Sequence, residues 1–182
     1  MRSQDCSFET QRLSVADWHA QTDGDDSLVE IIRELLTPEV TEYLPASWQG
    51  PFSAERTVDW ICDRDKEGIQ LLVLSRETRE PVALLLLYEA VTASTANARL
   101  RVGYVVSESQ WGRGLASELV GGLIDWARAS GVASIVGGVS AGNGASARVL
   151  QKCGFLRVEE ESSDAGSTWA WANSQLSDLR QP

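Results

Sequence analysis

The segment with the clearest chemical signal is a glycine-containing loop, Gln110-Trp-Gly-Arg-Gly-Leu-Ala-Ser117. Its two glycines, Gly112 and Gly114, let the backbone approach a ligand closely. A helical pattern that begins directly after them offers free N–H groups and the positive end of a helix dipole. We therefore expect the loop to bind a phosphate or a pyrophosphate. Arg113 either adds positive charge at the rim of that site or is an exposed arginine without a ligand.

Two common phosphate-binding motifs do not fit this loop. A nucleoside triphosphate site needs the Gly-x-x-x-x-Gly-Lys-Ser/Thr pattern, which the sequence lacks. A dinucleotide site needs Gly-x-Gly-x-x-Gly and an acidic residue about 20 positions later. The loop supplies only the first half of that pattern, and the segment Val132–Val139 contains no acid. Dinucleotide binding stays an alternative with partial support.

Cysteine and histidine give no indication of a metal site. The three cysteines, Cys6, Cys62 and Cys153, form no Cys-x-x-Cys pair, and the single histidine, His19, has no thiol near it in the sequence. Cys153 precedes Gly-Phe on an apolar helical pattern, so we expect a buried small side chain and not a nucleophile. His19 is expected to be exposed.

The first part of the chain is predicted to be helical. Ser27 and Glu30 form a capping-box pattern that opens a helix with apolar residues at helical spacing up to Leu36. Thr37-Pro38 then begins a second, short helix.

A third helix is predicted from about Ala54 to Lys66. Val58, Ile61 and Cys62 form its apolar face, and Gly68 ends it.

Three strands are predicted next, and they lead into the glycine loop. Ile69–Leu74 and Val82–Ala90 are short apolar runs separated by the polar turn Arg76–Pro81. A loop over Thr92–Ala96 precedes a third strand, in which apolar and polar residues alternate as far as Val106. Three consecutive strands of this kind predict an antiparallel meander.

After the loop the order is helix, strand, helix, strand. The helix starts at Leu115 and ends near Gly131. A strand over Ser134–Val139, a helix over Ala145–Lys152 and a strand over Phe155–Val158 follow. Thr168–Ala172 is expected to return as a hairpin partner across the acidic stretch from Glu159 to Glu161 and Asp164, which we interpret as a solvated strand end and loop. The fold class is therefore α/β, with an antiparallel first half and one crossover unit in the second.

Length and charge exclude several classes of protein. A chain of 182 residues predicts a single domain, 1–182. Its 16 Lys and Arg against 26 Asp and Glu give a net charge of −10, so we expect no nucleic-acid and no membrane partner. The longest apolar run, Val82–Tyr88, is far shorter than a membrane span, and the N-terminal residues lack the apolar stretch of a signal peptide. A cytoplasmic location is expected.

Several motifs in this order resemble the GCN5-related N-acetyltransferases. They are the loop Trp111-Gly-Arg-Gly-Leu-Ala116, the segment Asn143-Gly-Ala-Ser146, and the run from Val149 to Gly154-Phe155. Together with the opening Phe8-Glu-Thr-Gln-Arg12-Leu13, they are most similar to the branch that acetylates ribosomal-protein N-termini. The family loop is written Arg/Gln-x-x-Gly-x-Gly/Ala, and this chain departs from it by having Trp111 at the first position.

The resemblance implies a fold and a co-substrate. It implies a single domain with a mixed central sheet, an antiparallel N-terminal meander, a splayed parallel pair of strands and helices on both faces. It also implies binding of acetyl-CoA without a metal. Pantetheine would add to the strand end at Val105 and Val106, as a peptide adds to a strand edge, and Asn143 would anchor it. The remaining implied cofactor-binding residues are Trp111, Gly112, Arg113, Gly114, Leu115, Ala116 and Ser117.

The resemblance also implies catalytic residues for acetyl transfer to an amine. Many members protonate the departing thiolate with a tyrosine, but Leu150 stands at that position here, so Ser146 is the candidate donor. Asn143 and Ser146 are equally typical of a helix N-terminus, and capping and function can coexist. A base is needed as well, because an amine with a pKa of about 10.4 must lose a proton. Glu89, at the end of the Val82 strand, is the candidate because that strand should neighbour the cofactor strand, and water is the alternative.

The acceptor is left open. If the family layout holds, the N-terminal helices and the Ser47–Phe52 loop line its side of the cleft. A small-molecule or peptide amine fits the chemistry, and a homodimer is a candidate assembly. A non-catalytic acyl-CoA-binding domain is the main alternative, because the family tyrosine is missing.

Overall fold

The computed structural model describes residues 6–89 and 99–174. The described residues fall into two compact units. Unit 1 spans Met1–Leu86 and Tyr104–Ala116, and unit 2 spans Leu87–Gly103 and Ser117–Pro182. The glycine loop belongs to unit 1 and the Asn143 segment to unit 2.

Unit 1 contains a strand pair that the sequence did not predict. Strands β1 (Phe8–Glu9) and β2 (Leu13–Asp17) are antiparallel, with Phe8 opposite Val15, and β2 pairs with β3 (Ile69–Ser75). The predicted strand at β3 is confirmed, and it is buried from Ile69 to Leu74. β1 and β2 were missed because two and five residues are too few to establish a period of two.

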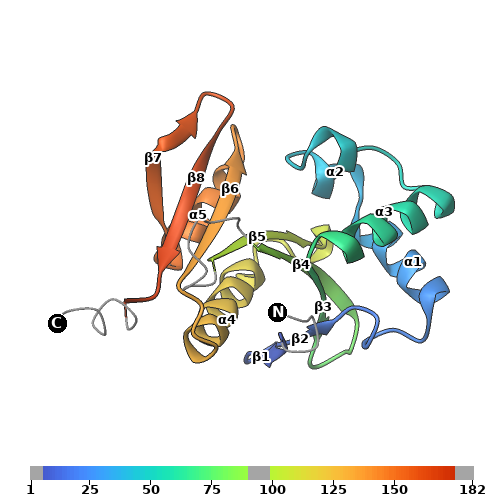
Figure 1. Cartoon of the computed structure of the whole chain (residues 1–182). Coiled ribbons are helices and arrows are strands. Elements are labelled where there is room, and N and C mark those ends of the chain that lie inside the picture. Colours follow the sequence, from blue (N-terminus) through green and yellow to red (C-terminus); the bar gives the residue numbers. More distant parts are fainter. Residues whose placement is uncertain (1–5, 90–98, 175–182) are drawn as a thin grey trace. The chain divides into compact units, whose positions relative to one another are not determined.

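Three helices follow β2, and two of them lie side by side. They are α1 (Asp25–Leu35), α2 (Pro38–Thr41) and α3 (Ala54–Glu67), and Figure 1 shows α1 and α3 adjacent. The predicted start of α2 is confirmed, because the Thr37 side chain accepts a hydrogen bond from the Val40 N–H.

The capping box predicted at Ser27 is wrong. Helix α1 begins two residues earlier, with Gly24 at the N-cap and no side-chain cap. Asp25 and Asp26 lie in its first turn, where carboxylates interact favourably with the helix dipole. These charges, and not a serine hydroxyl, mark the helix start.

The predicted buried face of α3 is also wrong in part. Ile61 is buried, but Val58 is 47% exposed and Cys62 is exposed, whereas Thr57 and Arg64 are buried. Both buried polar side chains are satisfied. The Thr57 hydroxyl donates to the Ser53 carbonyl, and Arg64 pairs with Glu67 and stacks on the ring of Trp48 at 4.6 Å. Polar residues with partners can replace aliphatic ones on a buried helix face.

Unit 1 has an aromatic core. The ring of Trp60 lies 6.0 Å from that of Trp18, 5.5 Å from that of Trp48 and 6.0 Å from that of Phe52. Val105, near the end of β5 (Arg99–Val106), belongs to the same core cluster. The strand that leads into the glycine loop is thus fixed by core packing.

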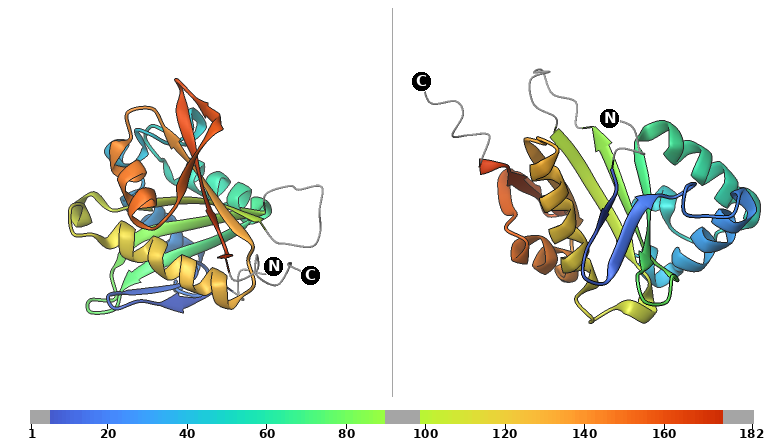
Figure 2. Two further views of the ribbon diagram at one scale, coloured as in Figure 1. Left: turned by 90° about the vertical axis from the view of Figure 1, so that its left-hand side faces the viewer. Right: turned by 90° about the horizontal axis from the view of Figure 1, so that it is seen from below.

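Unit 2 contains the predicted helix and strand alternation. Its elements are β6 (Ser134–Ser140), α5 (Gly144–Lys152), β7 (Leu156–Ser163) and β8 (Gly166–Ala172). α4 (Leu115–Ala129) enters it from the loop. β7 and β8 form an antiparallel hairpin, β8 pairs with β6, and α5 lies against β6 (Figure 2).

The acidic stretch was predicted to lie at a strand end and in a loop, and this is wrong for Glu159 and Glu161. Both are exposed, but they lie within β7, which continues to Ser163. Only Asp164 is in the turn. The strand pairs from Leu156 to Val158, and its register is irregular between Val158 and Ser163.

The strands have the hydrogen-bonded order β1-β2-β3-β4-β5-β6-β8-β7, where β4 is Pro81–Glu89. The predicted α/β fold with a mixed sheet and a β3-β4-β5 meander is confirmed. β5 and β6 form the parallel pair, whose register ends at Val102 opposite Gly137, although β5 runs on to Val106 and β6 to Ser140. The loop predicted over Thr92–Ala96 lies outside the described residues. No helix in the described part of the chain has the length and apolar character needed to span a bilayer.

Candidate functional site

The candidate site begins where β5 ends. Val105 and Val106 are buried, and the Ser107 N–H donates to the Val82 carbonyl of β4 at 2.9 Å. A single 3-10 turn, Glu108–Gln110, then redirects the chain toward the glycines. The start of the loop is therefore tied by a hydrogen bond to β4, the strand beside the one that it follows.

The two loop glycines have backbone conformations that favour glycine. Gly112 has φ 72° and Gly114 has φ 77°, the left-handed region in which other residues are strained. A side-chain carbon at Gly112 would meet nothing within 4 Å. The glycines are required by the turn of the backbone, and the space beside Gly112 is open.

The loop and the first turn of α4 present a row of backbone donors. The backbone N–H groups from Gly112 to Ser117 donate no hydrogen bond to any of the described residues. The first N–H groups of a helix lack intrahelical acceptors and carry the positive end of the dipole. Trp111 to Gly114 are exposed. This geometry suits an oxyanion of the size of a phosphate.

Trp111 fixes the loop through its indole. Its Nε1 donates to the Val106 carbonyl at 2.8 Å, while the residue is 51% exposed. The indole therefore links the loop to the end of β5.

Two arginines contact the loop, and only one was predicted. Arg113 Nη1 donates to the side-chain oxygen of Gln110 at 2.8 Å. Arg12, from the turn between β1 and β2, donates through Nη1 to the Arg113 carbonyl at 3.1 Å. The two residues are 101 positions apart, and the sequence offered no signal for this contact beyond the resemblance of the N-terminal segment.

In unit 2, Asn143 caps α5. Its Oδ1 accepts a hydrogen bond from the Ser146 N–H at 3.0 Å, so the capping interpretation is confirmed for this pair. Both residues are half-buried. Their roles in binding and catalysis stay predictions.

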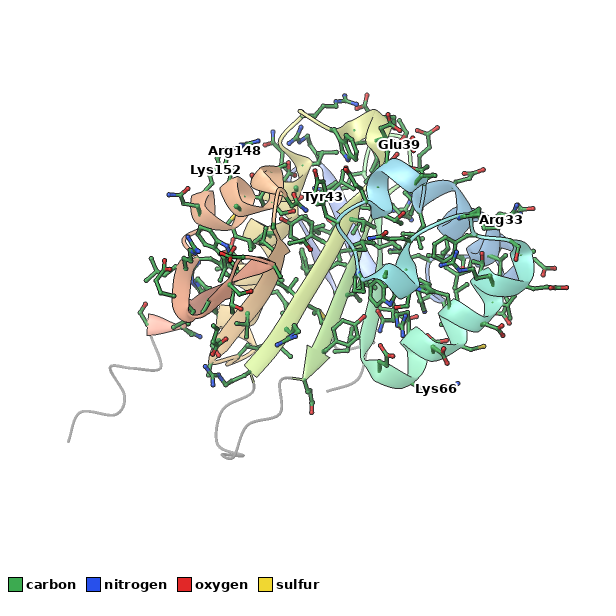
Figure 3. All side chains as sticks on the ribbon, turned by 90° about the horizontal axis from the view of Figure 1, so that it is seen from above. Arg33, Glu39, Tyr43, Lys66, Arg148 and Lys152 are labelled. Carbon is green, nitrogen blue, oxygen red and sulfur yellow. The ribbon has the colours of Figure 1, made fainter. Side chains whose placement is uncertain are left out.

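Leu150 is the residue that the family resemblance predicts at the position of the tyrosine. It is 1% exposed, and one of its methyl groups lies 3.2 Å from where a Gly137 Cβ would be. The same Gly137 Cβ would lie 3.5 Å from a methyl group of Val102. The position is therefore a packed apolar contact between α5 and the paired strands, without a proton donor. On the exposed face of the same helix, Arg148 and Lys152 project outward (Figure 3).

Cys153 is partly buried, and its surroundings make the thiol a weaker nucleophile. Its thiol donates to the Ser117 carbonyl at 3.4 Å. Burial raises the pKa of the Cys153 thiol, and the nearby Lys152 only partly offsets this. A raised pKa lowers the thiolate fraction, as expected for a packing residue.

Glu89, the predicted base, is exposed at the last position of β4. The loop contacts β4 near the other end of that strand, at Val82. The role of Glu89 stays a prediction. Among the described residues, no group of three or more His, Cys, Asp or Glu side chains could hold a metal ion.

Comparison with known proteins gives a family and a shared fold. The family model for the acetyltransferase (GNAT) domain matches residues 19–156. A comparison with curated proteins finds no significant match.

Three solved structures illustrate the shared fold. An acetyltransferase of the GNAT family from Bacillus anthracis is 16% identical, covers 93% of this chain and 99% of its own, and has a TM-score of 0.74. The ribosomal L7/L12 alpha-N-protein acetyltransferase RimL, in complex with coenzyme A, is 17% identical over 92% of this chain and 98% of its own, with a TM-score of 0.71. Spermidine N-acetyltransferase from Vibrio cholerae, in complex with CoA and spermine, is 13% identical over 89% of this chain and 96% of its own, with a TM-score of 0.69.

The predicted family resemblance is confirmed by the family model, and the resemblance to the ribosomal-protein branch is supported by RimL among the similar structures. Because the family model spans well over half of the chain, the protein belongs to the GNAT acetyltransferase family and is an N-acetyltransferase.

Proposed function

We propose that this protein transfers an acetyl group from acetyl-CoA directly to a primary amine in a ternary complex. The observation that carries the proposal is the row of backbone N–H groups from Gly112 to Ser117, in the loop and the first turn of α4, which donate no hydrogen bond to any residue that the structure describes. Such a row can bind a diphosphate without any lysine or metal ion. The adjacent Arg113 adds positive charge.

The pantetheine arm is assigned to the end of β5. Val105 and Val106 are buried, so they would act through their backbone and not their side chains. The amides of pantetheine can pair with an exposed strand edge in the way that a peptide does. The end of the β5–β6 register at Val102 supports this, because β5 continues beyond it. Asn143 would anchor the same arm.

The transfer step needs two proton movements. The amine nitrogen attacks the thioester carbonyl carbon, the carbon–sulfur bond breaks, and the thiolate takes a proton. We assign that proton to Ser146 and the removal of the amine proton to Glu89 or to water. Positioning of amine and thioester can account for much of the rate, so strong acid–base residues are not obligatory.

A cationic amine is the favoured acceptor class. Residues 17–67, which contain the N-terminal helices, carry 13 Asp and Glu against 4 Lys and Arg. An excess of negative charge raises the local concentration of cations. The similar structures include proteins named for ribosomal L7/L12 and for spermidine, so a protein N-terminus and a polyamine are both tested.

We further propose that the chain acts as a single domain in the cytoplasm, without a metal ion, nucleic acid or membrane. A homodimer is the candidate assembly.

The deciding experiment measures free CoA thiol released from acetyl-CoA with a panel of amines. The panel contains spermidine, peptides with free N-termini, and aminoglycosides. Release that depends on an amine, with the acetylated product found by mass spectrometry, supports the proposal. Tight binding of acetyl-CoA with no release across the panel would favour the non-catalytic alternative, for which the apolar Leu150 is the specific argument. Stabilisation by NADH and not by acetyl-CoA in a thermal melt would favour a dinucleotide site.

A further inference from the structure

We propose that Arg12 is a positioning residue for cofactor binding, which orients the peptide between Arg113 and Gly114 so that the Gly114 N–H faces the diphosphate. The inference rests on the proposed function and adds to the site a residue from the N-terminal hairpin. It concerns contacts within unit 1 alone.

The contact between Arg12 and the loop is close and directional. Arg12 Nη1 donates to the Arg113 carbonyl at 3.1 Å, and its Nη2 lies 3.9 Å from where a Gly114 Cβ would be. The guanidinium therefore lies against the peptide that joins these two residues.

Arg12 itself is held at a fixed place. The turn from which it projects is closed by two hydrogen bonds between Thr10 and Leu13, at 2.9 and 3.0 Å. Arg76, directly after β3, donates its backbone N–H to the Arg12 carbonyl at 2.8 Å and its guanidinium to the Thr10 carbonyl at 2.7 Å. The hairpin turn is thus held against the sheet, and the backbone of Arg12 has a fixed position.

The consequence for the loop follows from peptide geometry. In a trans peptide the carbonyl of one residue and the N–H of the next point in opposite directions. When Arg12 binds the Arg113 carbonyl, the Gly114 N–H must point away from Arg12. Gly114 has a φ of 77° and no side chain to restrict it, so its flanking peptides need an external contact to fix their orientation.

The side chains of Arg12 and Arg113 contact different parts of the loop. The Arg113 guanidinium is engaged by Gln110 at 2.8 Å, whereas its carbonyl is engaged by Arg12. A planar guanidinium with several donors suits such a bridging role better than a lysine ammonium does. The positive charge of Arg12 also favours an anion at the loop, but orientation of the Gly114 N–H is the role assigned here.

The test compares Arg12→Ala and Arg12→Lys with the wild type. Lys66→Ala is the control, because it removes the same charge from an exposed position on α3, where Lys66 pairs only with Asp63 among the described residues (Figure 3). The measurements are the Kd for CoA by calorimetry at low salt and at about 1 M salt, where the Debye length is about 3 Å. They are joined by kcat/KM with acetyl-CoA and with S-acetylpantetheine, which lacks the diphosphate.

We expect Arg12→Ala to weaken CoA binding by about tenfold at both salt concentrations, in line with loss of a charge-assisted hydrogen bond. Arg12→Lys should recover part of this loss, and Lys66→Ala should bind CoA like the wild type. The acceptor KM, the melting temperature and kcat/KM with S-acetylpantetheine should be unchanged in all three.

Three results would overturn the inference. Wild-type CoA affinity in Arg12→Ala shows that the contact has no role. A loss that disappears at high salt shows that only charge matters. An equal loss with S-acetylpantetheine shows a general structural defect. If the wild type itself binds no CoA, the proposed function is wrong. If the wild type binds CoA and Arg12→Ala binds it equally well, only the role of Arg12 is wrong.

Discussion

The indole Nε1 of Trp111 donates a hydrogen bond to the carbonyl oxygen of Val106 at 2.8 Å. The family resemblance predicts Trp111 at the position where the motif begins with arginine or glutamine, and Val106 is the last residue of β5. The bond links the end of the strand to the loop. We infer that this tryptophan compensates for its departure from the motif by fixing the loop's first residue.

Removal of this bond should loosen the loop without disrupting the core. Trp111→Phe keeps an aromatic ring but loses the indole N–H. We expect a decrease in CoA affinity of about threefold to tenfold, since a hydrogen bond contributes about 1 kcal/mol, and a small change in the melting temperature. Calorimetry with CoA measures the first and differential scanning fluorimetry the second. Unaltered CoA affinity would show that the Trp111–Val106 link has no role in binding.

Gly114 should tolerate no side chain. Gly114→Ala forces an alanine to a φ of 77°, which costs about 1 to 2 kcal/mol, and it narrows the approach to the backbone donors. Gly114→Glu should abolish acetyl-CoA binding, because it adds bulk and negative charge at the diphosphate.

The matched control for Gly114 is Gly121→Ala. Gly121 lies inside α4 without a positive φ, and a side-chain carbon there meets nothing within 4 Å of the described atoms. That substitution should stabilise the helix by about 0.5 to 1 kcal/mol and leave binding intact. CoA affinity preserved in Gly114→Glu would count against the assignment of the loop.

Asn143 can be tested for capping and for binding separately. Asn143→Asp retains an oxygen that accepts from the Ser146 N–H, whereas Asn143→Ala loses the cap at a cost of about 1 kcal/mol. We expect Asp to keep the wild-type melting temperature and to weaken CoA binding, because the side-chain N–H donor is lost. If Asp matches the wild type in both measurements, Asn143 serves only as a cap.

The two proposed proton-transfer residues should affect catalysis and not cofactor affinity. Ser146→Ala should lower kcat by about tenfold to a hundredfold, within the range for loss of a general acid, with an unchanged Kd for CoA. Glu89→Gln should lower kcat by about tenfold to a hundredfold at neutral pH, within the range for loss of a general base, again with an unchanged Kd for CoA. A Glu89→Gln enzyme with the wild-type kcat assigns the base to water.

The cysteines should differ in reactivity by their burial. Burial raises the pKa of the Cys6 thiol from 9.0 to about 12, whereas Cys62 is exposed. Alkylation at neutral pH should therefore modify Cys62 first and leave Cys6 and Cys153 protected. Peptide mass spectrometry of the folded protein over time measures this order, and Cys6 labelled as fast as Cys62 would contradict its burial.

The raised pKa of the Cys6 thiol also lowers the free energy of unfolding at alkaline pH. The folded state keeps Cys6 protonated, so its contribution is complete below pH 9 and is lost as the pH rises toward the folded pKa of about 12. The free energy of unfolding of Cys6→Val should fall less steeply between pH 9 and 12 than that of the wild type.

Much of the protein could be predicted from local patterns in its sequence. The apolar runs at β3 and β4, the start of α2 at Thr37-Pro38, and the helix that follows Gly114 depend on neighbouring residues, so a single sequence specifies them. The glycine loop belongs to this class as well, because its positive φ angles and its helix dipole are local properties.

Tertiary structure decided the features that depend on distant partners. Thr57 and Arg64 are buried on α3 because Ser53, Glu67 and Trp48 satisfy and cover them, which no helical periodicity reveals. The pair β1–β2 forms because β3 provides its neighbour, and this is what brings Arg12 to the carbonyl of Arg113. Sequence periodicity reports which residues prefer burial, whereas the partner of a polar group 101 positions away is chosen only when the chain has folded.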